Sequence, residues 1–187
     1  MSLNLKDKSQ IEVRLSGFGG QGIVLAGTVL GRAAAVEEGR NAVMMQSYGP
    51  ESRGGAANAE VMIADGEIPY PHCTALDVVV TLAQEAYDKF GATRAQNTLL
   101  IVEKDLVELD AESEKGKKVL RVPFTALADQ VGKRMVLNMV TLGFLCKATN
   151  LVDKDCLKRA ILDAVPKGTE ELNMKAFDTG YNYDAGA

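Results

Sequence analysis

A glycine-rich segment near the start of the chain, Gly17-Phe18-Gly19-Gly20-Gln21-Gly22, constrains the fold more than any other feature. It follows a short apolar strand pattern at residues 11–16 and leads directly into a long helical pattern. A glycine-rich turn between a strand and a helix leaves backbone N–H groups unpaired at the positive end of the helix dipole. Such turns bind anions, typically the phosphates of a nucleotide or a nucleotide-like cofactor. The five residues Gly17, Gly19, Gly20, Gln21 and Gly22 are therefore candidate binding residues.

Two other interpretations of this segment stay open. The glycines could serve only to let the strand and the helix pack closely. Gln21 argues against that interpretation, because a polar amide at the start of the helix is placed to hydrogen-bond something outside the core. The segment could also bind NAD(P), but such a site needs an acidic residue at the end of the second strand, roughly 20 residues further on. That strand ends here at Gln46-Ser47, which disfavours NAD(P).

Length and composition predict one globular domain. A chain of 187 residues with 47% apolar and 25% charged residues supports a single substantial core. We expect this domain to span residues 11–187, preceded by a disordered or added segment at residues 1–10. A net charge of −4 without a basic stripe disfavours nucleic-acid binding. No apolar run approaches the roughly 20 residues that cross a membrane, and the N-terminus lacks the apolar core of a secretory signal.

The cysteine and histidine content predicts no redox or metal centre in this chain. Cys73, Cys146 and Cys156 are widely spaced, and His72 is the only histidine. A zinc site or an iron–sulfur cluster held by this chain alone is therefore not expected. Three thiols without a disulfide framework are typical of the reducing cytoplasm. We expect Cys146 to be buried in a helix and His72 to be structural, and we assign no catalytic residue.

The order of the predicted elements indicates an α/β fold. Strands and helices alternate first, and helices alone follow, which is typical of a Rossmann-like three-layer, doubly wound and mostly parallel sheet with C-terminal helices. Residues 41–46 are apolar at consecutive positions and predict a strand buried on both faces. The charged segment 103–117 predicts solvated surface. Asn138 and Asp153 are placed to cap helices. Strands are expected at residues 11–16, 41–46, 58–63, 77–82, 98–102 and 118–122, and helices at residues 21–37, 84–90, 125–131, 136–148 and 170–181. A further helix is expected between its cap Asp153 and the break at Pro166.

A second glycine-rich segment, Tyr48-Gly-Pro-Glu-Ser-Arg-Gly-Gly-Ala-Ala57, belongs to no ordinary dinucleotide site. Its arginine, Arg53, offers a planar fork of donors to a carboxylate or phosphate, and the glycines after it leave room around the guanidinium. We therefore take Ser52, Arg53, Gly54 and Gly55 as facing an anionic ligand or a partner subunit. The simpler alternative is a surface ion pair between Arg53 and a nearby glutamate, Glu51 or Glu60.

The two segments together resemble a known family. The Gly17–Gly22 motif, the Gly-Pro-Glu-Ser-Arg-Gly-Gly loop and the later Tyr-Pro-His are similar to the gamma subunit of 2-oxoacid:ferredoxin oxidoreductases. The resemblance runs from about residue 13 to the end, and includes Asp77-Val-Val-Val-Thr-Leu-Ala-Gln-Glu-Ala-Tyr and Asn173-Met-Lys-Ala-Phe. Two separate motifs in the correct order are far more specific than a glycine spacing alone.

The resemblance implies a function within a complex. Members of the family decarboxylate a 2-oxoacid on thiamine diphosphate with Mg²⁺, transfer the acyl group to coenzyme A and pass electrons to ferredoxin through iron–sulfur clusters. Alpha and beta subunits form the thiamine site, and some members add a cluster-bearing delta subunit. The gamma subunit is the Rossmann-like companion that packs near the active site and helps to receive coenzyme A. The length and loops look most like members that act on 2-oxoglutarate, with pyruvate, branched-chain 2-oxoacids and aryl-pyruvates as alternatives.

Two rival functions remain at this point. A free-standing NAD(P)-dependent oxidoreductase would bind nicotinamide cofactor tightly as an isolated chain. A purely structural subunit would use both glycine-rich segments to contact only protein. Coenzyme A would then not protect the assembled complex.

Overall fold

The computed structural model describes residues 3–48, 55–91, 97–116 and 118–186. Its centre is a six-stranded sheet with the strand order β2-β3-β1-β4-β5-β6. The strands are β1 (Gln10–Phe18), β2 (Asn41–Tyr48), β3 (Ala56–Ala64), β4 (Val78–Thr81), β5 (Leu99–Glu103) and β6 (Lys118–Val122). Each strand lies where the sequence predicts one, within a few residues.

The sheet is mostly parallel, as the sequence predicts. Strands β1, β4, β5 and β6 run parallel to one another, whereas β3 is antiparallel to both of its neighbours, β1 and β2. The antiparallel β3 therefore separates β1 from β2. As a result β2 is an edge strand, and its side chains from Ala42 to Met45 are half-buried rather than buried. The expectation that residues 41–46 form a strand buried on both faces is wrong, because apolar side chains on an edge strand give the same local pattern.

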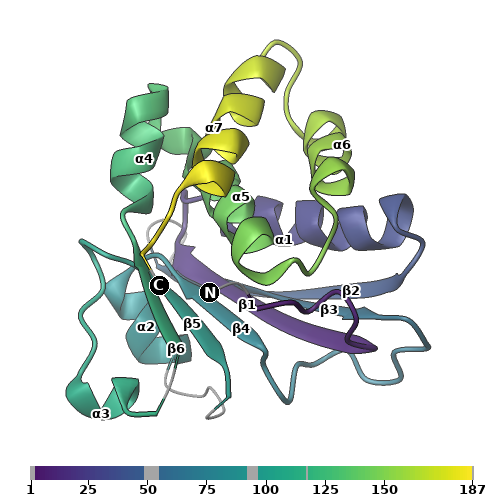
Figure 1. Cartoon of the computed structure of the whole chain (residues 1–187), viewed down its shortest axis with the longest axis horizontal. Coiled ribbons are helices and arrows are strands. Elements are labelled where there is room, and N and C mark those ends of the chain that lie inside the picture. The colour runs from purple at the N-terminus through teal and green to yellow at the C-terminus, as the bar shows by residue number, and fades with distance from the viewer. Residues whose placement is uncertain (1–2, 49–54, 92–96, 117, 187) are drawn as a thin grey trace.

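Helices cover the sheet unequally (Figure 1). Helices α1, α5, α6, α7 and α4 lie over one face, and α2 and α3 lie over the other. The helices are α1 (Ile23–Arg32), which continues as the π-helical turn η1 (Ala33–Glu37), α2 (Gln84–Phe90), α3 (Ala111–Glu114), α4 (Phe124–Val131), the 3-10 turn η3 (Arg134–Val136), α5 (Leu137–Thr149), α6 (Lys154–Ala164) and α7 (Glu170–Asn182). This arrangement confirms the predicted α/β fold with C-terminal helices.

The C-terminal helices pack into the main core rather than forming a separate layer. Helix α5 is buried over most of its circumference, including the fully buried Leu142 and Leu145, so it lies between the sheet and α7. Helix α6 begins at Asp153, whose carboxylate accepts hydrogen bonds from the backbone of Asp155 and Cys156, as predicted for a cap. Burial of Cys146 is also confirmed, and this burial raises the pKa of its thiol to about 12.

The start of the chain lies against the end of α5. The backbone N–H groups of Leu3 and Leu5 donate to the carbonyls of Ala148 and Thr149 at 2.7 and 2.8 Å, and the side chain of Leu5 is buried. The described part of residues 1–10 is thus packed where the sequence predicts a disordered segment. Among the described residues, no helix combines the length and the apolar character that a membrane span requires.

Candidate functional site

The first glycine-rich segment forms the turn between β1 and α1, at the carboxyl ends of the parallel strands. Phe18 ends β1, and Thr81 and Glu103 lie at the same end of β4 and β5. The chain leaves β1 over the face covered by α1, and it leaves β4 over the face covered by α2 (Figure 1). The strand ends of β1 and β4 therefore flank the topological switch point, where open α/β sheets bind ligands.

The structure brings the described part of both glycine-rich segments together. The backbone N–H of Gly19 donates to the carbonyl of Gly55 at 3.0 Å. Since Gly55 immediately precedes β3, whose first residue pairs with Phe18, the second segment also reaches this end of the sheet. The other candidates of that segment, Ser52, Arg53 and Gly54, lie outside the described residues.

Gln21 bridges the ends of β1 and β4 at the switch point. Its Oε1 accepts from the backbone N–H of Phe18 at 2.7 Å, and its Nε2 donates to the carbonyl of Leu82 at 3.3 Å. Both ends of the amide are thus bonded within the chain, whereas its second N–H is not used by either of these bonds, so a contact outside the core stays a prediction. Gln21 positions the turn and fills the space between the two strand ends.

Replacing Gln21 with alanine is expected to lower the free energy of unfolding by about 1–2 kcal/mol, because two backbone groups lose their partner. Chemical denaturation of the isolated chain measures this loss. Thr28→Ala in the same helical stretch is the control: Thr28 is exposed and its hydroxyl only donates back to Val24, so we expect a change below about 0.5 kcal/mol. Equal losses in the two variants would contradict the bridging role.

The glycines of the turn have different roles. A Cβ on Gly17 would lie 2.3 Å from Oε1 of Gln21, and one on Gly22 would lie 2.4 Å from Nδ2 of Asn138. Close packing within the chain therefore explains both of these glycines. Gly20 differs in its surroundings: its φ of +101° is left-handed like that of Gly22, +72°, but apart from its chain neighbours no atom of the described residues lies within 4 Å of where its Cβ would be. The packing interpretation thus accounts for only part of the motif.

Asn138 supports the turn from α5 rather than capping that helix. It is buried, it lies one residue inside α5, and its Nδ2 donates to the carbonyl of Gly22 at 3.4 Å. The expectation that Asn138 caps the helix is wrong, because Val136 occupies the N-cap position. The distance in sequence between Asn138 and Gly22 hid this contact.

Several backbone N–H groups of the turn have no partner in the described part of the chain. The first hydrogen bond within α1 runs from Ala26 N–H to Gly22, and no side chain caps the helix. The N–H groups of Gly20, Gly22 and Ile23 therefore donate to none of the described residues. These groups lie at the positive end of α1, where an anion is stabilised.

A cavity of about 360 Å³ lies beside the turn. Sequence reasoning found only two of the residues that line it, Gly20 and Gln21. The others come from the segment after β5, from the start of α4 and from the η3–α5 junction. They are Leu106, Thr125, Arg134, Met135 and Leu137. The guanidinium of Arg134 is held by Asp129 through contacts of 3.0–3.3 Å.

Glu103 organises the far wall of this cavity. It is fully buried at the end of β5, and its Oε2 accepts from the backbone N–H and the hydroxyl of Thr125 at 2.7 and 2.8 Å. Its Oε1 accepts from the N–H of Asp105 at 3.4 Å. The expectation that residues 103–117 are all solvated surface is therefore wrong at Glu103. Its position directly after a buried strand pattern was a signal that sequence reasoning could have used.

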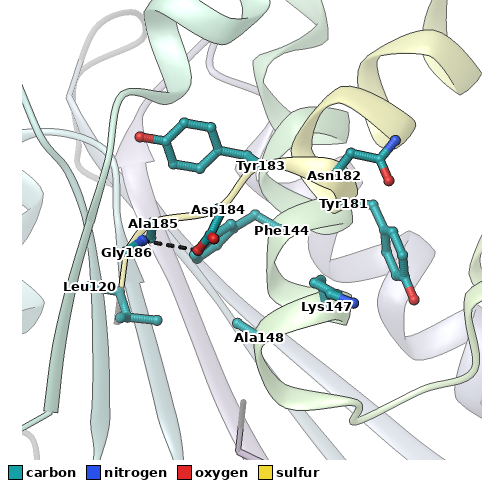
Figure 2. Close-up of a pocket in the computed structure, with 10 residues that line it drawn as sticks. All are labelled: Leu120, Phe144, Lys147, Ala148, Tyr181, Asn182, Tyr183, Asp184, Ala185 and Gly186. Carbon is teal, nitrogen blue, oxygen red and sulfur yellow. Dashed lines mark hydrogen bonds between the residues drawn. The ribbon is translucent and has the colours of Figure 1, made fainter. Parts of the chain in front are cut away.

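A second cavity, of about 350 Å³, lies under the C-terminal tail and contains none of the predicted site residues. Figure 2 shows Leu120 of β6 on one side, Phe144 and Lys147 of α5 below, and the segment from Tyr181 to Gly186 around the rim. The Asp184 carboxylate accepts from the Gly186 N–H, which folds the tail on itself. The predicted site is therefore the turn and not this cavity.

A profile of the pyruvate ferredoxin/flavodoxin oxidoreductase family matches residues 12–183 of the chain, nearly its whole length. This chain belongs to that family. The resemblance of its two glycine-rich segments to the gamma subunits of 2-oxoacid:ferredoxin oxidoreductases is confirmed.

Individual relatives agree with the family assignment. The chain is 47% identical over 175 residues to the 2-oxoglutarate synthase subunit KorC of Methanocaldococcus jannaschii, covering 93% of this chain and 94% of that one. The solved keto/oxoacid ferredoxin oxidoreductase gamma subunit of Geobacter sulfurreducens has a TM-score of 0.81 and 39% identity, covering 92% and 94% of the two chains. A 2-oxoglutarate:ferredoxin oxidoreductase of Magnetococcus marinus shares the fold, with a TM-score of 0.81 at 23% identity, over 93% of this chain and 31% of its own.

Family membership means that the chain works as one subunit of an oxidoreductase and has partner subunits. Within the described ranges, no group of three or more His, Cys, Asp and Glu side chains is arranged to hold a metal ion. The Tyr-Pro-His motif of this oxidoreductase subunit lies before β4, at the opposite end of the sheet from the turn. There the ring centroids of His72 and Tyr70 lie 5.2 Å apart. Burial raises the pKa of the neighbouring Cys73 thiol to about 12.

The strand order of this family member also argues against NAD(P) binding. A dinucleotide site places the acidic residue on the strand next to β1, where it reaches the ribose. Here β3 occupies that place, and β2 lies two strand spacings away, roughly 10 Å. Gln21 in addition fills the space between the ends of β1 and β4.

Proposed function

We propose that this chain is the gamma subunit of a cytoplasmic, thiamine-diphosphate-dependent 2-oxoacid:ferredoxin oxidoreductase whose substrate is 2-oxoglutarate. In this proposal alpha and beta subunits hold thiamine diphosphate and Mg²⁺, and the complex passes electrons through iron–sulfur clusters to ferredoxin, with a delta subunit as a further component. The similarity to a 2-oxoglutarate synthase subunit supports the choice of 2-oxoacid. The chain is not catalytic alone.

The part proposed for this chain is to receive coenzyme A at the β1–α1 turn. The observation that carries the proposal is the open surrounding of Gly20 together with the N–H groups of Gly20, Gly22 and Ile23, which donate to no residue in the described ranges. Coenzyme A carries a pyrophosphate and a 3′-phosphate, and both are anions of the kind that a helix N-terminus stabilises. Gly17, Gly19 and Gln21 would then hold the shape of the turn.

The second glycine-rich segment would supply the positive charge that binds a phosphate, through Arg53. The Gly19–Gly55 hydrogen bond ties this segment to the turn, which supports a shared site. We propose that Ser52 and Arg53 contact a phosphate of coenzyme A, with Gly54 and Gly55 leaving space for it. The alternative partner Glu60 forms an ion pair with Arg14, whose Nη2 lies 2.6 Å from Oε1 of Glu60.

Charge reversal at the turn tests the proposal. In the reconstituted complex, Gly20→Asp is expected to raise the KM for coenzyme A at least about tenfold, because a carboxylate beside a phosphate costs about 1.4 kcal/mol or more. Gly20→Asn is the matched control, since it has the same left-handed backbone and nearly the same shape without the charge. Arg53→Gln is expected to raise the same KM by a similar factor through loss of a charge-assisted hydrogen bond.

Steady-state kinetics at saturating 2-oxoglutarate measure the KM for coenzyme A of each variant. An unchanged KM for coenzyme A in both Gly20→Asp and Arg53→Gln would remove the proposed role and would favour a purely structural subunit. If the native complex turns over pyruvate or a branched-chain 2-oxoacid but not 2-oxoglutarate, the assigned substrate is wrong.

A further inference from the structure

Strand β2 forms one edge of the sheet, and its outer side pairs with no other strand of the described residues. Its antiparallel pairing with β3 is regular over eight consecutive residue pairs, from Asn41–Ala64 to Tyr48–Ala57, without a bulge. Alternate residues of an antiparallel strand direct their backbone N–H and C=O groups away from the partner strand. Beyond the β2–β3 ladder, no hydrogen bond joins the β2 backbone to another residue's backbone in the described ranges. The outer side of β2 therefore presents a row of donors and acceptors about 27 Å long that fits a further strand.

The two edges of the sheet are protected differently. Soluble proteins usually guard an exposed edge strand with charged side chains, proline, a bulge or a short strand. Strand β6, at the other edge, is five residues long and carries the exposed Lys118 and Arg121. Strand β2 is eight residues long, and its sequence Asn-Ala-Val-Met-Met-Gln-Ser-Tyr contains no charge and no proline. An unguarded edge of this length is expected to be covered by another strand.

The two faces of β2 are covered unequally. Helix α1 and the turn η1 pack on β2, and Ala42 and Met44 join the main core on that face. On the opposite face, α2 packs on β1, β3 and β4. There Val43 and Met45 are half-buried and belong to no apolar cluster of the described residues. Two apolar side chains thus lie beside the open edge, where an added strand would bury them.

The side chains on this second face have a pattern that reads the same in both directions. The face carries, in chain order, Asn41, Val43, Met45 and Ser47, which are polar, apolar, apolar and polar. The pattern is symmetric about Met44. If two copies of β2 pair antiparallel around a two-fold axis through Met44, Val43 of each copy lies opposite Met45 of the other, and the two polar positions also meet. Because the strand carries no charge, this pairing brings no like charges together.

We infer that β2 is the docking surface for a second copy of this chain, whose own β2 pairs with it antiparallel and joins the two six-stranded sheets into one. Two-fold dimers with a self-complementary contact are the commonest homo-oligomers of soluble proteins. The symmetric, uncharged pattern of β2 favours a second copy over a strand of a different protein, because pairing with a different strand requires no such symmetry. The inference does not rest on the coenzyme A proposal.

Analytical ultracentrifugation of the full chain tests the inference. The unsubstituted chain is expected to form a dimer whose fraction rises with protein concentration. Met45→Lys and Val43→Glu are each expected to weaken self-association at least about tenfold, because each buries a charge in the strand pair and brings it near the same charge of the other copy. An equimolar mixture of the two variants is expected to recover a dimer with one copy of each, since the new lysine then lies opposite the new glutamate.

Leu120→Lys is the matched control, because Leu120 is a half-buried apolar residue in the middle of the other edge strand, β6. This variant is expected to dimerise as the unsubstituted chain does, and thermal unfolding of every variant establishes that it is folded. Amide hydrogen exchange adds a readout that is specific to strand pairing. Exchange within β2 is expected to slow as the protein concentration rises, whereas exchange within β6 is expected to stay the same.

Three outcomes would overturn the inference. The first is an unsubstituted chain that stays monomeric over the whole concentration range of the experiment. The second is a dimer that persists in both Met45→Lys and Val43→Glu, which would place the contact between copies on another surface. The third is a pair of folded, monomeric variants that do not associate when they are mixed.

Discussion

Gly180→Ala is expected to destabilise the protein by about 3 kcal/mol, because α5 and α7 touch through their backbones. A Cβ on Gly180 would lie 1.9 Å from the carbonyl oxygen of Val140, and one on Gly143 would lie 2.0 Å from the carbonyl oxygen of Phe177. Backbone atoms cannot rotate away as a side chain can, so the two helices would have to separate. Their separation would loosen the packing of Phe177, which is fully buried.

Calorimetry of the isolated chain checks this expectation. For a chain of this size, about 3 kcal/mol corresponds to a fall in Tm of roughly 6–12 °C. Gly31→Ala is the control for the substitution itself. Its Cβ would lie 3.8 Å from Val61 Cγ1, an ordinary contact, and alanine in a helix is favoured over glycine by about 0.5–1 kcal/mol. If Gly180→Ala has the same Tm as the unsubstituted chain, the two helices are not held at backbone contact.

Glu103→Ala is expected to cost about as much as Gly180→Ala, roughly 3 kcal/mol of the free energy of unfolding. The substitution removes a fully buried carboxylate that accepts from the backbone N–H and hydroxyl of Thr125 and from the N–H of Asp105. Donors to a charged acceptor lose more than donors to a neutral one, and the first turn of α4 loses its only side-chain acceptor among the described residues.

Denaturant unfolding measures the loss in the free energy of unfolding, and two further variants serve as comparisons. Glu103→Gln keeps one acceptor oxygen and should lose about half as much. Glu114→Ala removes a carboxylate that pairs with Arg121 near the surface, and we expect a change below about 1 kcal/mol. If Glu103→Ala and Glu114→Ala cost the same, the buried carboxylate does not organise α4.

Local patterns in the sequence were sufficient to predict most of the fold. The strands, the helices and the α/β class follow from apolar periodicity and glycine placement, and the structure confirms them within a few residues. The edge position of β2 could not be predicted in this way. An uncharged, apolar strand such as residues 41–46 looks the same whether another strand or only a helix lies beside it.

The contacts of the candidate site depend on pairs that are far apart in the chain. Gln21 binds the carbonyl of Leu82, and Asn138 binds the carbonyl of Gly22. Glu103 finds its partner Thr125 in a helix that begins after another strand. Each of these polar side chains looked like a ligand, a cap or a solvated charge, because its true partner cannot be identified before the fold is known.

The bridge formed by Gln21 also determines the direction from which a small molecule can approach this subunit. In open α/β sheets ligands lie in the crevice outside the carboxyl ends of the strands at the switch point, and here an amide bonded on both sides joins two of those ends. An inhibitor directed at this subunit would have to lie across the top of the sheet.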